Sequence, residues 1–193
     1  MFELSPVVEV EYHSSPFEWA QSESSETFIQ LNDRSSDDDV ARMVALLASY
    51  NGILSSGSIG KVTHAVMTAD DLALPGGLMV RAENIQIPPS CCCGLEDWRE
   101  WFSVEPGGIS PWLGHDPSPW VECKPDLAII WADGKLGEQS PSVPVSYSDL
   151  EAGRQSARAD LIAFTARLSS WLSRHAPQNT DLSQRFSEIF DIY

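Results

Sequence analysis

Two amphipathic helices at the end of the chain are the clearest elements that the sequence predicts. Apolar residues recur at helical spacing over 150–175, and Pro177 ends the pattern. Ser148 and Glu151 have the spacing of a capping box at the start of this long helix. Apolar positions share one helical face again after Thr180, so we expect a second, shorter helix there.

The first half of the chain combines strand patterns with one helix pattern. Apolar and acidic residues alternate over 8–12, which is typical of a strand with one buried face. The apolar positions of 40–50 have helical spacing, follow a polar cap at 35–39 and stop at the Asn-Gly pair 51–52, so they predict a capped helix. Further strands are expected at 27–31, at 59–67 and, as one strand or two, at 78–87.

Short elements separated by turns make up the middle of the chain. A short helix is expected at 94–103, where the apolar residues have helical spacing. Two strands at 120–124 and 127–131 bracket a Pro-Asp turn at 125–126, as in a hairpin. Residues 141–145 contain two prolines and predict a connection to the long helix.

This order of elements is not a regular alternation of strands and long helices. It favours an α+β fold with a largely antiparallel sheet covered by helices, and with a long amphipathic helix and a short helix at the C-terminus. A length of 193 residues suits one domain, so we expect a single α+β domain over 1–193. The chain has no G-x-G-x-x-G or P-loop glycine pattern, which excludes phosphate cradles of these two types.

The charge of the chain is strongly acidic and unevenly distributed. There are 28 acidic and 12 basic residues, which gives a net charge of -16. Residues 1–39 contain ten acids and one base, whereas residues 151–193 contain five of each. Because nucleic-acid backbones and anionic membranes repel such a chain, we expect neither as a partner. A basic partner protein or a simple contribution to solubility is the favoured alternative.

The sequence also predicts the compartment. It contains no apolar run approaching the roughly 20 residues of a membrane span, and its N-terminus lacks the pattern of a signal peptide. Its four cysteines, three of them adjacent, do not resemble the spaced cysteines of a secreted disulfide framework. We therefore expect a cytoplasmic protein with reduced thiols.

Three adjacent cysteines, Cys91 to Cys93, directly precede the short helix expected at 94–103. The simplest expectation is that they are buried as small hydrophobic residues. A zinc site is a second interpretation, and its ligands would be Cys91, Cys93, His115 and Cys123. Apart from this zinc ion, no cofactor is expected. A disulfide, either between neighbours or to Cys123, is a third interpretation.

The fourth interpretation is a thiolate nucleophile among these cysteines. His115 or His64 would then act as its base, and Asp116 would orient that base. Glu96 and Asp97 disfavour this role, because their carboxylates lie in the first turn of the same helix and oppose a neighbouring thiolate.

A second candidate region extends from Ser110 to Trp120, where Ser-Pro-Trp occurs twice around Gly-His-Asp. Rigid prolines can hold aromatic walls around a polar pair such as His115 and Asp116, as in a ligand pocket or an interface hot spot. The simpler alternative is a stiff loop that packs its tryptophans on the core. If the chain has a site, we expect Trp112 to Trp120 to form it, with the cysteines packed behind.

The acidic run Asp37, Asp38 and Asp39 has two interpretations. It could bind a cation or meet a basic partner. The simpler interpretation is the first turn of a helix, where carboxylates offset the helix dipole.

The segments CCCGLEDWREW and WLGHDPSPWVE, within residues 91–122, resemble segments of uncharacterised bacterial proteins. In general character, a small acidic α+β protein without a cofactor motif is similar to immunity proteins of bacterial toxin systems. That resemblance implies a non-enzymatic protein that neutralises a toxin by binding it. The alternative is a metal- or thiol-dependent enzyme that uses Cys91 to Cys93 with His115 and Asp116. The expected partner-binding residues are Asp37, Asp38, Asp39, Trp112, His115, Asp116 and Trp120.

Overall fold

The computed structural model describes residues 1–10, 15–21, 26–54 and 56–193. The chain forms two compact units: unit 1 consists of Met1–Val7 and Gly76–Ala159, and unit 2 of Val8–Pro75 and Asp160–Tyr193. The strands are β1 (Phe2–Glu9), β2 (Phe28–Gln30), β3 (Gly76–Ala82), β4 (Ile85–Ile87), β5 (Trp120–Cys123), β6 (Leu127–Trp131) and β7 (Ser142–Ser146). The α-helices are α1 (Asp37–Tyr50), α2 (Ile59–Thr68), α3 (Tyr147–His175) and α4 (Leu182–Ile189). The 3-10 helices are η1 (Glu18–Ala20), η2 (Leu95–Ser103), η3 (Gly134–Gln139) and η4 (Pro177–Asn179).

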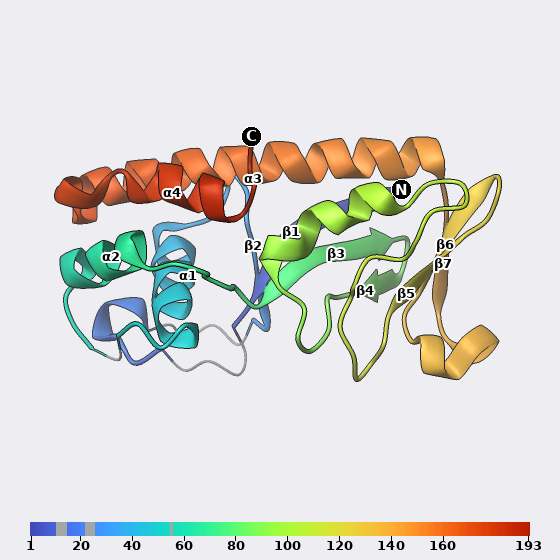
Figure 1. Ribbon diagram of the computed structural model, residues 1–193, viewed down its shortest axis with the longest axis horizontal. Helices are drawn as coiled ribbons and strands as arrows, with labels where there is room; N and C mark the ends of the chain where they lie inside the picture. The colour runs from blue at the N-terminus through green and yellow to red at the C-terminus, as the bar shows by residue number, and fades with distance from the viewer. Residues whose placement is uncertain (11–14, 22–25, 55) are drawn as a thin grey trace. The chain divides into compact units, whose positions relative to one another are not determined.

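The strands form two antiparallel sheets, which confirms the α+β prediction together with the long α3 and the short α4. The strand order is β2-β1-β3-β4 in one sheet and β5-β6-β7 in the other. Within the second sheet, Trp120 on β5 lies opposite Trp131 on β6, and the β5–β6 hairpin is the one that the sequence predicts. The first part of α3 packs on β1, since a Cβ added at Gly153 would lie 2.9 Å from the ring of Phe2 (Figure 1).

Strand β1 begins earlier than the alternation at 8–12 predicts. Its residues Leu4 to Val8 are all buried, so both faces of the strand are covered and no alternation is visible in the sequence. The end of the predicted strand, Glu11 and Tyr12, lies outside the described residues.

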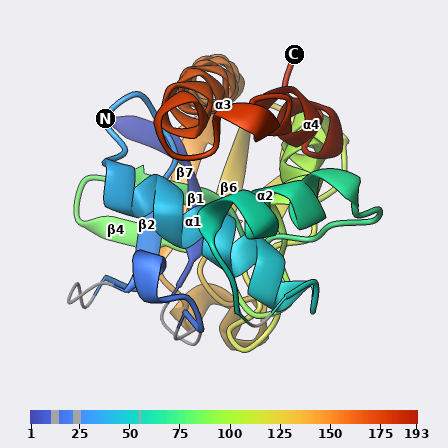
Figure 2. The same ribbon diagram turned by 90° about the vertical axis from the view of Figure 1, so that its left-hand side faces the viewer.

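The strand predicted at 59–67 is wrong, because this segment is helix α2. Val62, Thr63 and Val66 are buried on one helical face, and the hydroxyl of Thr63 donates to the carbonyl of Ile59 at 2.8 Å. The β-branched residues suggested a strand, but strand propensity is weak beside the packing of an apolar face. In unit 2 this face meets α1 and α4, and α4 lies beside the C-terminal part of α3 (Figure 2).

The connection predicted at 141–145 is also wrong, because these residues form most of strand β7. Val143 and Val145 are buried while Pro144 between them is exposed, which is the alternation of a strand with one covered face. Strand β7 is at the edge of its sheet. A proline is tolerated at an edge because its missing N–H group is not needed for pairing.

The start of α3 differs from the predicted capping box of Ser148 and Glu151. The hydroxyl of Ser146 accepts from the backbone N–H of Asp149 at 3.1 Å, so the cap is formed two residues earlier. Strand β7 runs directly into the helix and places the first helical turn at Tyr147. Glu151 is thereby free of a capping role and accepts from Arg154 at 2.6 Å.

Arg154 holds η2 in place within unit 1. Its guanidinium is buried and donates to the carbonyls of Trp101 and Val104 at 3.0 and 3.2 Å. It also lies over the ring of Phe102, 5.4 Å from the ring centroid. A 3-10 helix of nine residues has poor intrinsic stability, so these contacts from α3 stabilise a segment that could not persist alone.

We expect Arg154→Met to lower the free energy of unfolding by about 2 to 3 kcal/mol, because two buried carbonyls lose a charged donor. Arg158→Met, one turn along α3 and less buried, is the matched control and is expected to cost less than about 1 kcal/mol. Urea unfolding measures both values. Equal losses in the two variants would contradict the role of Arg154.

Helix α1 in unit 2 begins with a capping box and an ion-pair cluster. Ser36 and Asp39 exchange hydrogen bonds at 3.1 and 2.8 Å, which confirms the predicted cap. Asp37 accepts from Arg167 at 3.0 Å and from Arg174 at 2.6 Å. Partial desolvation raises the pKa of Asp37, but the hydrogen bonds and charges of both arginines outweigh it and lower the pKa below its ordinary 3.8.

We expect Asp37→Asn to destabilise the protein at neutral pH and to lose this effect in acid. A carboxyl group whose pKa is lower in the folded state stabilises the fold above its ordinary pKa, and this contribution disappears as the pH falls below it. Urea unfolding at a series of pH values down to below 3.8 measures the difference from wild type, with Asp38→Asn as the control. A difference that stays constant down to that pH is the contrary outcome.

Candidate functional site

The cysteine segment, residues 90–93, and the tryptophan loop, residues 110–120, both belong to unit 1. Backbone hydrogen bonds join them where the two segments cross. The N–H of His115 donates to the carbonyl of Cys91 at 3.1 Å, and the two residues form an isolated β-bridge. Ser90 extends the crossing, because its N–H donates to Leu113 and its hydroxyl to the carbonyl of His115, both at 3.0 Å. These bonds bring the two candidate regions of the sequence together.

Gly114 makes this crossing possible. Its φ is +91°, and an added Cβ would lie 2.6 Å from the carbonyl oxygens of Ser90 and Cys91. A residue with a side chain therefore meets both an unfavourable backbone conformation and a steric clash.

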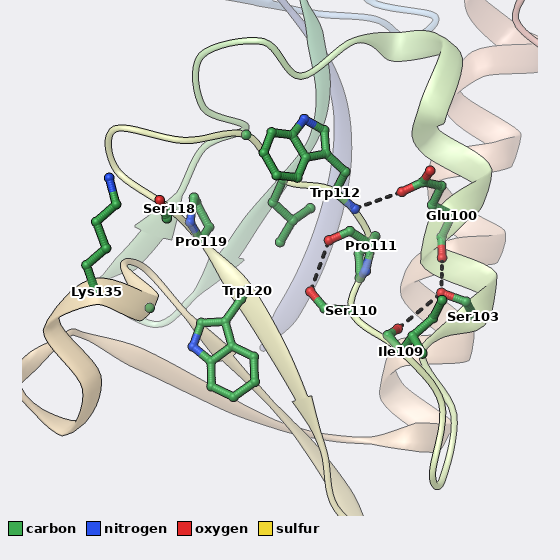
Figure 3. A pocket seen from close by; sticks show the side chains of 13 residues that line it. Glu100, Ser103, Ile109, Ser110, Pro111, Trp112, Ser118, Pro119, Trp120 and Lys135 are labelled. Carbon is green, nitrogen blue, oxygen red and sulfur yellow. Dashed lines mark hydrogen bonds between the residues drawn. The ribbon is translucent and has the colours of Figure 1, made fainter.

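An open pocket of about 810 Å³ is lined mainly by residues of the tryptophan loop. Figure 3 shows Trp112 and Trp120 on opposite sides of it, with Pro111 and Pro119 between them. Glu100 from η2 is at one end and Lys135 from η3 at the other. The lining residues are Glu100, Ser103, Ile109, Ser110, Pro111, Trp112, Leu113, Gly114, Ser118, Pro119, Trp120, Gly134 and Lys135.

Both exposed tryptophans contact neighbouring segments of unit 1, and hydrogen bonds hold Trp112 in position. The backbone N–H of Trp112 donates to Glu100 Oε2 at 2.7 Å, and its indole N–H donates to the carbonyl of Cys92 at 3.1 Å. The ring of Trp120 lies so close to Gly134 that a Cβ there would be 2.6 Å from it. Rings fixed before binding lose little conformational entropy when a ligand meets them.

The tryptophans of this region are divided between core and surface. Trp98 and Trp101 on η2 are buried, whereas the simpler interpretation of the loop expects burial of Trp112 and Trp120. Trp112 and Trp120 are 50% and 39% exposed and line the pocket instead. A proline directly precedes each exposed ring, whereas no proline directly precedes Trp98 or Trp101.

The three adjacent cysteines differ in environment. Cys93 is buried, and its thiol contacts the carbonyl of Trp112 at 3.6 Å. Burial, together with the negative charges of Asp97, Glu96 and Glu100, raises the pKa of Cys93 to about 12. This thiol is therefore protonated at neutral pH, and a thiolate nucleophile at Cys93 is disfavoured for the reason that the sequence indicates.

Cys91 and Cys92 are exposed, so the expected burial applies to Cys93 alone. Cys92 has a φ of +65°, which turns its side chain toward that of Cys91 and places the two sulfur atoms 3.4 Å apart. All four cysteines belong to the described part of the chain, and none of them forms a disulfide.

The candidate zinc ligands are only partly brought together. Cys91, Cys92 and His115 have ligand atoms within 4.8 Å of one another, so Cys92 stands where the sequence suggested Cys93. Cys123 lies on β5, where burial raises the pKa of its thiol. Nothing in the sequence indicates that Cys92 takes the place of Cys93 in this cluster, because the position of its side chain depends on the backbone conformation of Cys92.

The side chains of His115, Asp116 and Lys135 form a row joined by hydrogen bonds. Nδ1 of His115 is 3.1 Å from Asp116 Oδ2, and Asp116 Oδ1 accepts from Lys135 at 2.6 Å. The hydrogen bonds from Lys135 and then from His115 lower the pKa of Asp116, so this carboxyl group is ionised at neutral pH.

The acidic run lies on α1 in unit 2, whereas Trp112, His115, Asp116 and Trp120 belong to unit 1. Asp37 pairs with two arginines and Asp39 caps its helix. Two of the three carboxylates thus have structural partners within unit 2. The third, Asp38, lies in the first turn of the helix, as the dipole interpretation expects.

A search with this chain found no matching protein family, no matching curated protein and no matching solved structure. Among the described residues, no helix combines the length and the apolar character needed to cross a membrane.

We expect Gly114→Ala to lower the free energy of unfolding by more than about 2 kcal/mol, because backbone strain and the clash with Ser90 and Cys91 add. Gly107→Ala is the matched control: Gly107 also has a positive φ, of +76°, but an added Cβ would meet nothing within 4 Å. This control is expected to cost only the strain, about 1 kcal/mol. Urea unfolding compares the two. Similar losses in both variants would show that the close crossing contributes no stability.

Proposed function

We propose that this chain is a non-enzymatic binding protein that engages a partner protein through the Trp112–Trp120 pocket. The observation that carries the proposal is the pair of exposed tryptophans on opposite sides of one open pocket. Interface hot spots are enriched in tryptophan and are typically rigid and apolar at their centre. A pocket of about 810 Å³ accommodates one or two large side chains of a partner.

The polar groups that line the described pocket are mostly committed to the protein itself. Ser103 donates to the carbonyls of Glu100 and Ile109, and the hydroxyl of Ser110 accepts from the N–H of Val121. Glu100 accepts from the backbone of Trp112. A nucleophile activated by a neighbouring base needs two such groups that face each other, and binding does not. The arrangement supports recognition of an apolar surface more than chemistry.

The charge of the chain supports a basic partner. Unit 1, which carries the pocket, contains thirteen acidic and six basic residues. A net negative charge on unit 1 attracts a basic protein and raises the association rate. Together with the small α+β fold, this supports a protein of immunity type, which neutralises a toxin by binding it.

We expect Trp112→Ala and Trp120→Ala each to weaken partner binding by roughly 30-fold or more, as for a hot spot of about 2 kcal/mol. The partner is isolated from the native host with the purified chain as bait, and its affinity is then measured by calorimetric titration. Tyr50→Ala is the matched control, since Tyr50 is an aromatic residue of unit 2 that is 48% exposed, close to the 50% of Trp112.

An unchanged affinity in both tryptophan variants would refute the pocket as the binding surface. The immunity role has its own test, which is co-expression with the recovered partner. The wild-type chain should restore growth of cells that express the partner, and Trp112→Ala should not. A partner that is harmless to cells would leave the pocket as a binding surface and remove the immunity role.

A further inference from the structure

We propose that Cys91, Cys92 and His115 form a binding site for a thiophilic transition-metal ion, with Zn²⁺ as the representative ion. Their three ligand atoms lie within 4.8 Å of one another. Two thiolates and an imidazole are the ligands that such ions prefer over the oxygen ligands of Mg²⁺ and Ca²⁺. The three ligands are not among the residues that line the partner pocket, although Trp112 and Lys135 contact both, and the inference does not depend on the proposed binding function.

The spacing of the two sulfur atoms suits one shared ion. Tetrahedral coordination with Zn–S bonds of about 2.3 Å places two sulfur ligands about 3.8 Å apart. Cys91 Sγ and Cys92 Sγ are 3.4 Å apart, which is close to this spacing. Adjacent residues in an extended chain direct their side chains to opposite faces, and the positive φ of Cys92 removes that obstacle here.

His115 is oriented for coordination by a carboxylate behind it. Asp116 Oδ2 lies 3.1 Å from Nδ1, and when Nδ1 donates its proton to this oxygen, Nε2 carries the lone pair that a metal needs. Metal-binding histidines usually have such a partner, which fixes the tautomer and raises the basicity of the ligand. Lys135 holds the other oxygen of Asp116 at 2.6 Å and stabilises the carboxylate in this position.

The three ligands are held by backbone contacts that exist without a metal. The β-bridge joins His115 to Cys91, and the indole N–H of Trp112 donates to the carbonyl of Cys92. A site whose ligands are already positioned costs little conformational entropy to fill. Because both cysteines are exposed, a fourth position is accessible to water or to a group of a bound partner.

A disulfide between Cys91 and Cys92 is the competing use of this pair. It would require the sulfur atoms to approach to about 2.05 Å, and it would give no role to His115 or to its orientation by Asp116. The position of the imidazole beside both thiols is the observation that favours a metal ion.

Titration of the reduced full-length chain with Co²⁺ tests the proposal, because thiolate-to-cobalt charge transfer produces absorption that oxygen ligands do not. We expect one equivalent of Co²⁺ to produce this absorption, and one equivalent of Zn²⁺ to abolish it. Cys91→Ser, Cys92→Ser and His115→Ala should each weaken binding at least roughly 10-fold, and Asp116→Asn should weaken it by roughly 10- to 100-fold through loss of orientation. Cys123→Ser and His64→Ala are the matched controls and should bind as the wild type does.

Absence of the charge-transfer absorption in the reduced wild-type chain would overturn the proposal. So would a Co²⁺ affinity that is unchanged from the wild type in both Cys91→Ser and Cys92→Ser. A third contrary outcome is a reduced chain that binds no Co²⁺ but loses two thiols on mild oxidation in a manner that requires both residues, which would identify a disulfide pair instead. Circular dichroism of every variant confirms that it is folded.

Discussion

The close approach of Gly114 to Ser90 and Cys91 is the constraint on which the candidate site depends. At this crossing, two segments separated by more than twenty residues share backbone hydrogen bonds with no side chain between them. The crossing fixes His115 beside Cys91 and directs the loop that follows toward the pocket. The tryptophan walls and the thiol cluster are therefore two consequences of one contact.

A series of hydrogen bonds also connects α3 to the pocket. Glu151 pairs with Arg154, Arg154 holds two carbonyls of the η2 region, and η2 carries Glu100, which accepts from the backbone of Trp112. Each of these directed hydrogen bonds fixes a segment whose own preference for its conformation is weak. The burial of Arg154 is unfavourable in one respect, since its Nε has no hydrogen-bond partner among the described atoms. A buried charge that makes three hydrogen bonds nevertheless stabilises an otherwise marginal 3-10 helix.

Elements with strong local signals were predictable, and elements that depend on their neighbours were not. The long helix is predicted correctly because its apolar stripe covers many turns and outweighs any single residue. Helix α2 is mistaken for a strand because Val62, Thr63 and Val66 satisfy both patterns, and only packing against α1 and α4 distinguishes them. Strand β7 is missed because Pro144 argues against a strand unless the strand is known to be at an edge.

The sequence by itself determined the α+β class, the acidic character and the region in which a site would be found, since periodicity, charge and the prolines around Trp112 and Trp120 are local properties. Only the tertiary structure decided that Cys91 and Cys92 face solvent while Cys93 is buried, and that His115 joins the first two. The physical reason is that these choices depend on a positive φ at Cys92 and on a backbone crossing at Gly114. Both result from contacts between segments distant in the chain, and no local pattern of residues encodes such contacts.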